Sequence, residues 1–272
     1  MDFRALLELI RVGNCLMTAV AVAIGYYLVT LDTTCALGIA MISAFLICAG
    51  GQAINDVYDV DIDKKISKKR PIPSGRVPKQ FAYRLSITLF IAGILVSLAL
   101  TQTAIIIAVA ISVLLFAYAA RLYKAKYIGN FIVALGTALP FAFGAAAAMM
   151  AVPALVIVLS MGAFFANLGR EVTKDFEDLK KDRGFKRTMP MIHPQMAKSL
   201  IAAYYVAAVL LGIYAYISFS LGTAYIIITV LAAFVFLYTA LLAEKGKYTK
   251  SQKTSKKGMF VYLIALIAAI VR

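Results

Sequence analysis

The chain has 272 residues, of which 62% are hydrophobic, and its mean hydropathy is +0.87. Soluble domains are about half apolar, so this composition excludes an ordinary soluble enzyme and predicts an all-helical, multi-pass membrane protein. The net charge is +15, but the basic residues are dispersed through loops between apolar stretches, which makes nucleic acid a poor partner. The three cysteines have no metal-ligand spacing and are expected to be free packing residues: Cys15, Cys35 and Cys48.

Six charge-free stretches set the number of membrane crossings. Two suit a single span each, at about 20 residues per crossing: 12–31 and 33–55. The last stretch, 258–271, is short unless Lys256 and Lys257 snorkel. The other three are too long for one helix and are predicted to fold back at 101–103, 151–153 and 218–222 respectively: 85–120, 127–169 and 199–243. The sequence therefore predicts nine transmembrane helices in a single domain that spans 1–272.

The basic residues give these spans an orientation, because lysine and arginine concentrate in cytoplasmic loops. Of the 28 basic residues, 27 fall in the N-terminal segment or in alternate loops, and only Arg272 lies elsewhere. We therefore predict a cell-membrane protein with a cytoplasmic N-terminus and an outside C-terminus. The loops that follow the second and sixth spans are also placed on the cytoplasmic side.

An acidic pattern occurs twice along the chain. The spacing D-x-x-D-x-x-x-D, which we call a ladder, recurs at an offset of 119, since 175 − 56 = 119. With the topology, this offset predicts two four-helix repeats plus a ninth helix. We hypothesise that an axis along the membrane normal relates the repeats and brings the ladders face to face. The first ladder is Asp56, Asp59 and Asp63, and the second is Asp175, Asp178 and Asp182.

The spacing within each ladder predicts a metal site. On a helix, positions 0, 3 and 7 point within about 60° of one another, so each ladder presents three carboxylates on one face. Hard oxygen ligands suit Mg²⁺, which usually also takes phosphate oxygens from a substrate. We therefore assign the six aspartates and the adjacent Asn55 to Mg²⁺ binding. The alternative is that the ladders are charged loops that pair with neighbouring lysines.

Several cations and tyrosines lie at the same depth in the predicted membrane. Arginine offers two parallel donors to phosphate oxygens, so we assign diphosphate binding to basic residues beside the ladders. A third polar cluster lies at the cytoplasmic end of the fourth span. It could instead be an interfacial aromatic belt with a snorkelling lysine. The basic residues are Arg70, Arg76, Arg170 and Lys174, and the cluster is Tyr118, Tyr123 and Lys124.

These motifs resemble the UbiA superfamily of intramembrane prenyltransferases. The resemblance rests on both ladders, on Lys69-Arg70-Pro71-Ile72-Pro73-Ser74-Gly75-Arg76 and on Thr188-x-Pro190, and it includes Arg11-x-x-Asn14 in the first span. It implies nine helices around a central cavity and Mg²⁺ that bridges the aspartates to a prenyl diphosphate. It also implies catalytic roles for Asp59, Asp63, Asp178, Asp182, Lys124 and Tyr118, and substrate binding by Arg11, Asn14, Asn55, Arg70, Arg76, Arg170, Lys174 and Tyr123.

Within that superfamily the chain is most similar to archaeal members that act on a lipid phosphate. The resemblance implies transfer of a geranylgeranyl group from its diphosphate to the hydroxyl of geranylgeranylglyceryl phosphate, and no obligate protein partner is evident. Tyr118 could stabilise an allylic cation, and the proton acceptor is Asp63, Asp182 or the released diphosphate. An aromatic, quinone-precursor acceptor is the main alternative. A cation transporter is more remote, because its sites usually lie near the bilayer midplane.

Overall fold

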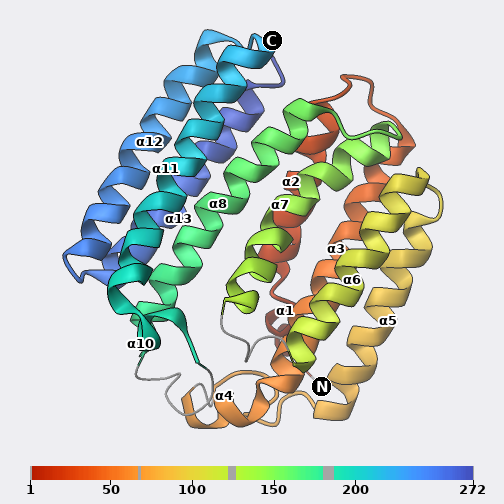
Figure 1. Ribbon diagram of the computed structural model, residues 1–272. Coiled ribbons are helices and arrows are strands. Elements are labelled where there is room, and N and C mark those ends of the chain that lie inside the picture. The colour runs from red at the N-terminus through yellow and green to blue at the C-terminus, as the bar shows by residue number, and fades with distance from the viewer. Residues whose placement is uncertain (1, 67–68, 122–126, 180–186, 272) are drawn as a thin grey trace. The chain divides into compact units, whose positions relative to one another are not determined.

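The computed structural model describes residues 2–66, 69–121, 127–179 and 187–271. Within these residues all regular structure is helical, as predicted (Figure 1). The chain divides into two compact units, which are described separately. The first unit is Met1–Tyr123 with Pro140–Val152, and the second is Lys124–Leu139 with Pro153–Arg272.

The first unit is built around α3, which packs against α2, α5 and α6. Small residues along α3 allow these close approaches: a Cβ at Gly50 would touch the side chain of Phe90 on α5. Arg11 separates α1 from α2, which meet at a bend of 49°. The helices are α1 (Phe3–Ile10), α2 (Val12–Tyr27), α3 (Cys35–Tyr58), α4 (Val60–Ile66), α5 (Lys79–Ser97) and α6 (Gln102–Ala120), together with the second half of α7 (Ile128–Ala148).

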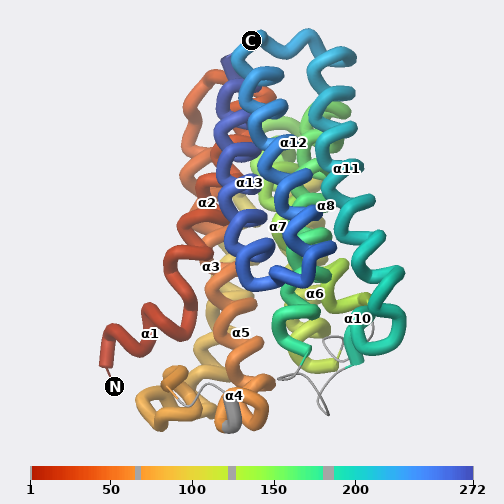
Figure 2. The backbone as a smooth tube through the Cα atoms, turned by 90° about the vertical axis from the view of Figure 1, so that its left-hand side faces the viewer, coloured from red at the N-terminus to blue at the C-terminus, as the bar shows by residue number. Residues whose placement is uncertain are grey.

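The second unit is built around α8, which packs against α11 and α13. Figure 2 shows α11, α12 and α13 side by side, in agreement with their contacts. Buried polar groups tie them together: Ser251 of α13 donates to the carbonyl of Thr239 at 2.9 Å, and Tyr205 of α11 donates to Ser255 at 2.9 Å. The helices after the first half of α7 are α8 (Ala154–Glu177), α10 (Met189–Ile192), α11 (Pro194–Phe219), α12 (Thr223–Glu244) and α13 (Tyr248–Ala268).

The three predicted fold-back points are confirmed, because α5 ends before 101, α7 before 151 and α11 within 218–222. Among the described residues, seven helices are long and apolar enough to cross a membrane, or eight if α1 and α2 form one bent span. The helix α13 is not among them. It begins at Tyr248, ten residues before the apolar stretch, so its first turns carry the lysines that precede Gly258. A count of nine spans therefore stays a prediction.

The helix bounds follow the repeat closely. Adding 119 to the bounds of α3 gives 154–177, which are the bounds of α8. The same shift places α2 at 131–146, within α7, and α5 at 198–216, within α11. Shifted α6, at 221–239, overlaps α12. Four helices of each half thus correspond, whereas the axis that relates the halves and the central cavity stay predictions.

Within the first unit, α2 and the second half of α7 touch through two glycines. A Cβ at Gly25 would overlap the backbone of Phe141, and a Cβ at Gly144 would overlap the backbone of Val22. The two glycines correspond in the repeat, since 25 + 119 = 144, and so do the residues that they face, since 22 + 119 = 141. Only glycine permits this approach, because any other side chain would displace the facing helix.

Candidate active site

The first ladder lies where α3 passes into α4. Asp56 is in the last turn of α3, Asp59 follows its end and Asp63 is in α4. The helical hydrogen bonding continues through the junction, because the Asp59 amide donates to Asn55 at 2.9 Å and the Asp63 amide donates to Asp59 at 2.8 Å. Asp56 and Asp63 are buried, at 2% and 5% exposure. Local backbone geometry thus keeps the ladder on one side of the chain.

Arg70 bridges two rungs of this ladder. Its Nη1 donates to Asp63 Oδ2 at 2.7 Å and lies 3.4 Å from Asp56 Oδ1. A single guanidinium therefore offsets two buried carboxylates, which confirms that these two side chains face the same space. The sequence predicts that Arg70 binds the substrate's diphosphate. In the structure its guanidinium is instead bound to Asp56 and Asp63 of the first ladder.

Arg11 also contacts the first ladder, from the start of α2. Its Nη2 donates to Asp56 Oδ1 at 2.6 Å, and its Nη1 donates to Gln52 Oε1 at 2.8 Å. Its backbone is left-handed, with φ 48° and ψ 60°, a conformation that costs about 1–2 kcal/mol for a residue with a Cβ. The ion pair helps to offset that cost. Asn14 is exposed on α2, and the structure does not test its predicted role in substrate binding.

Asp59 has a different environment from its neighbours in the ladder. The amide of Asn55 donates to its Oδ2 at 2.8 Å, and among the described residues no basic side chain forms an ion pair with it. Burial, together with the charge of Asp63, raises the pKa of Asp59 to about 6. Burial thus outweighs the attraction of the Arg70 charge, so a further cation beside Asp59 would stabilise its ionised form.

The donor set fits a hard divalent cation, since carboxylate and amide oxygens are the ligands that Mg²⁺ prefers. The guanidinium of Arg70 shows that Asp56 and Asp63 can lie on either side of a positive charge. In the described part of the chain, however, no three acidic, histidine or cysteine side chains already form a metal-ready group. Binding of Mg²⁺ therefore requires side-chain adjustment around Asp59 and Asp63.

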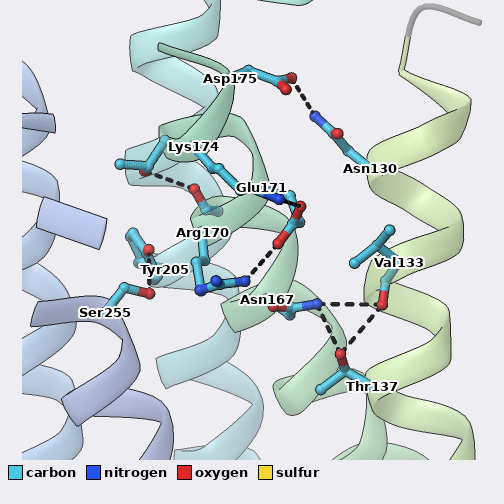
Figure 3. A network of polar contacts seen from close by, with 12 residues as sticks. Asn130, Val133, Thr137, Asn167, Arg170, Glu171, Lys174, Asp175, Tyr205 and Ser255 are labelled. Carbon is cyan, nitrogen blue, oxygen red and sulfur yellow. Dashed lines mark hydrogen bonds and ion pairs between the residues drawn. The ribbon is translucent and has the colours of Figure 1, made fainter. Parts of the chain in front are cut away.

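The second ladder lies at the end of α8. Asp175 is buried in the last turn of that helix, Asp178 follows its end and Asp182 lies outside the described residues. Figure 3 shows Asn130 of α7 directed toward Asp175, where its Nδ2 donates to Oδ2 at 2.7 Å. The sequence analysis missed Asn130. Its signal was the repeat, since Asn130 is 119 residues after Arg11.

The cations of the second ladder surround another missed residue, Glu171. Arg170 donates to it at 2.6 Å, and the Lys174 ammonium lies 3.9 Å from its second oxygen (Figure 3). Glu171 is buried on α8 and corresponds to Gln52 in the repeat, since 52 + 119 = 171. Among the described residues, the Nε of Arg170 is buried without a hydrogen-bond partner. Arg170 and Lys174 thus share an acidic partner, and their diphosphate role stays a prediction.

The remaining predicted residues are more scattered. Arg76 is exposed to solvent in part and pairs with Glu8 of α1 at 2.6 Å, while it also donates to the carbonyl of Lys69 at 2.7 Å. Tyr118 is half-buried near the end of α6. Tyr123 and Lys124 lie outside the described residues. Among the described residues, the ion pair of Arg76 is thus with Glu8, and the roles predicted for Tyr118, Tyr123 and Lys124 stay predictions.

The helical fold, with seven or eight candidate membrane spans among the described residues, defines a multi-pass membrane protein, and comparison with known proteins identifies its family. The profile of the UbiA prenyltransferase family matches residues 15–264. The chain belongs to this family and is therefore a prenyltransferase, which sets aside the cation-transporter alternative.

The relatives cover the chain from end to end. It is 34% identical over 271 residues to digeranylgeranylglyceryl phosphate synthase of Methanopyrus kandleri, covering 98% of this chain and 99% of that one. The corresponding enzyme of Thermococcus kodakarensis is 30% identical, with both chains fully covered.

Solved structures agree with this fold. A digeranylgeranylglyceryl phosphate synthase structure has a TM-score of 0.86 and 31% identity, with 98% of each chain covered. A UbiA homologue from Archaeoglobus fulgidus, solved with GPP and Mg²⁺, has a TM-score of 0.72 over 98% of this chain and all of its own. At 17% identity, that second likeness shows the fold alone.

Proposed function

We propose that the chain transfers the geranylgeranyl group of geranylgeranyl diphosphate to the free hydroxyl of geranylgeranylglyceryl phosphate. The C–O bond to diphosphate breaks, the hydroxyl oxygen bonds to the same prenyl carbon, and the second ether bond of an archaeal lipid is formed. The observation that carries this proposal is 34% identity over 98% of the chain to a protein named as that synthase.

Each ladder offers the residues for the diphosphate chemistry. Mg²⁺ would be held by Asp59, Asp63 and Asp178, with Asp182 outside the described residues, and when bound it neutralises charge on the departing diphosphate. The sequence also assigns Asn55, Asp56 and Asp175 to the metal. Arginine and lysine side chains bind the remaining phosphate oxygens.

After C–O cleavage, the apolar walls of the spans keep water from the allylic cation. Tyr118 remains our proposed cation–π partner. The hydroxyl proton passes to a ladder carboxylate, Asp63 or Asp182, or to the released diphosphate.

The acceptor can be identified directly with labelled donor. Purified protein in lipid nanodiscs with Mg²⁺ and labelled geranylgeranyl diphosphate is expected to form labelled lipid with geranylgeranylglyceryl phosphate. The expectation follows because both proposed substrates have apolar tails and anionic heads. Product should be absent with an aromatic acid such as 4-hydroxybenzoate. Prenylation of the aromatic acid alone would replace the lipid acceptor with a quinone-precursor acceptor while retaining the prenyltransferase.

The proposed orientation places both ladders on the cytoplasmic side, and cysteine labelling tests it. Asp61 of α4 and Asp32, between α2 and α3, are both exposed. In a background without the three natural cysteines, Asp61→Cys should react with a membrane-impermeant maleimide only in inside-out vesicles. Asp32→Cys should react only in right-side-out vesicles. The reverse pattern would invert the topology.

A further inference from the structure

The two halves of the chain hold the first aspartate of each ladder in the same way. Arg11 precedes Asp56 by 45 residues, and Asn130 precedes Asp175 by 45 residues. The two donors occupy equivalent positions in the repeat, since 11 + 119 = 130, and so do the two aspartates, since 56 + 119 = 175. In each unit the contact joins the beginning of one span to the end of the next. The link itself is therefore repeated, although its donor is a guanidinium in one half and an amide in the other.

From this repetition we propose that Asp56 and Asp175 are positioning residues, each of which fixes the start of the preceding span, and that the metal is held by the later aspartates. The inference rests on the proposed function, because it divides roles within the same acidic site. It also narrows the sequence-based assignment, in which all six aspartates bind Mg²⁺.

The charges around Asp56 support a positioning role. Its Oδ1 accepts from Arg11 at 2.6 Å and lies 3.4 Å from Arg70, and its side chain is only 3% exposed. Arginine stays protonated in proteins, so both positive charges beside the Asp56 carboxylate are permanent. A metal ion that bound this carboxylate would compete with two guanidinium groups, whereas at Asp63 it would compete with Arg70 alone among the described residues. Among the described residues Asp59 forms no ion pair, and its side chain accepts a hydrogen bond from the neutral Asn55 amide.

The backbone beside Arg11 shows what the contact positions. Arg11 is left-handed at the 49° bend between α1 and α2. Both ends of its guanidinium are used, one by Asp56 and one by Gln52, and both acceptors lie on α3. In the second half, Asn130 lies in the first turn of α7, directly after the left-handed Tyr127. Each contact thus holds a span close to its beginning, at the residue before α2 and in the first turn of α7.

Separate measurements of metal binding and catalysis test the division of roles. The probe is Mn²⁺, followed by electron paramagnetic resonance on purified protein. Asp56→Asn is expected to bind Mn²⁺ within about threefold of the parent protein, whereas Asp59→Asn should weaken binding more than about tenfold. Because Arg11 loses its carboxylate partner and Arg70 loses one of two, Asp56→Asn should raise the KM for prenyl diphosphate about tenfold and change kcat less than about threefold.

Arg11→Gln provides the second variant, and it should reproduce the change in KM without a change in Mn²⁺ affinity. If the two residues act as one unit, the double variant should be no worse than either single variant. Weak Mn²⁺ binding in Asp56→Asn, or fully additive effects on KM, would overturn the proposal. If both Asp56→Asn and Asp59→Asn keep the Mn²⁺ affinity of the parent protein, the result would instead contradict the metal site of the proposed function.

Discussion

Asp59→Asn is expected to abolish prenyl transfer while the protein remains folded. The carboxylate is half-buried, carries a pKa raised to about 6 by burial and by Asp63, and is hydrogen-bonded only through the neutral Asn55 amide among the described residues. Substitution by asparagine keeps the shape and removes the charge that would hold a cation. Loss of one group that stabilises charge in the transition state costs about 10²–10³-fold in kcat, and a lost metal costs more.

The matched control for this variant is Asp61→Asn, two residues further along the chain. Asp61 lies in α4 with a side chain that is 84% exposed, and it forms an ion pair with Lys64 at 3.9 Å. An exposed pair at this distance contributes about 0–1 kcal/mol, so transfer should stay close to the parent rate. The assay is release of labelled lipid from labelled geranylgeranyl diphosphate. Equal activity of Asp59→Asn and Asp61→Asn would remove Asp59 from the catalytic site.

Asp178→Asn is expected to behave like Asp59→Asn, because 59 + 119 = 178 and both residues follow the end of the corresponding helices α3 and α8. The neighbours differ, however. Position 55 carries an asparagine that donates to Asp59, whereas its counterpart Lys174 lies near Glu171. The two ladders are thus equivalent in backbone position and different in local charge.

The sequence was a good guide to features that depend on local pattern. Apolar length located the fold-backs, and the offset of 119 predicted that the spans carrying the two ladders correspond, as α3 and α8 do. These features follow from hydrophobic burial and from helical periodicity, which are readable along the chain. The same offset contained the Asn130 contact to Asp175, but the pattern could be recognised only after the structure showed Arg11 on Asp56.

Features that depend on neighbours in space were not predicted. Nothing in the spacing shows that Arg170 and Lys174 share Glu171, or that Arg76 pairs with Glu8, 68 residues away. The start of α13 was missed for a related reason. Lysines interrupt the apolar pattern before Gly258, yet Ser251 and Ser255 are buried and hydrogen-bonded on its inner face. Tertiary contacts there override the hydropathy signal.

The largest expected loss of stability comes from the glycine contact between α2 and α7. Gly144→Ala adds a methyl group that overlaps the backbone of Val22, and Gly25→Ala does the same to Phe141. Backbone cannot adopt another rotamer, so α2 and α7 must separate, and overpacking of this kind costs about 1–3 kcal/mol or more. Each variant should therefore show a lower Tm in detergent, measured by thermal unfolding, and a smaller monodisperse fraction on gel filtration.

Gly136→Ala, on the same helix α7, distinguishes the contact from the general effect of replacing a helical glycine. Among the described residues, no atom beyond the local helix backbone lies within 4 Å of a Cβ at Gly136, and alanine favours a helix over glycine by about 1 kcal/mol. Its Tm should stay the same or rise, as should that of Gly13→Ala on α2, where the surrounding space is also open. A Tm for Gly144→Ala equal to that of Gly136→Ala would show that α2 and α7 do not meet at these glycines. A fall confined to Gly25 and Gly144 would tie the 119-residue repeat to the packing of both helices.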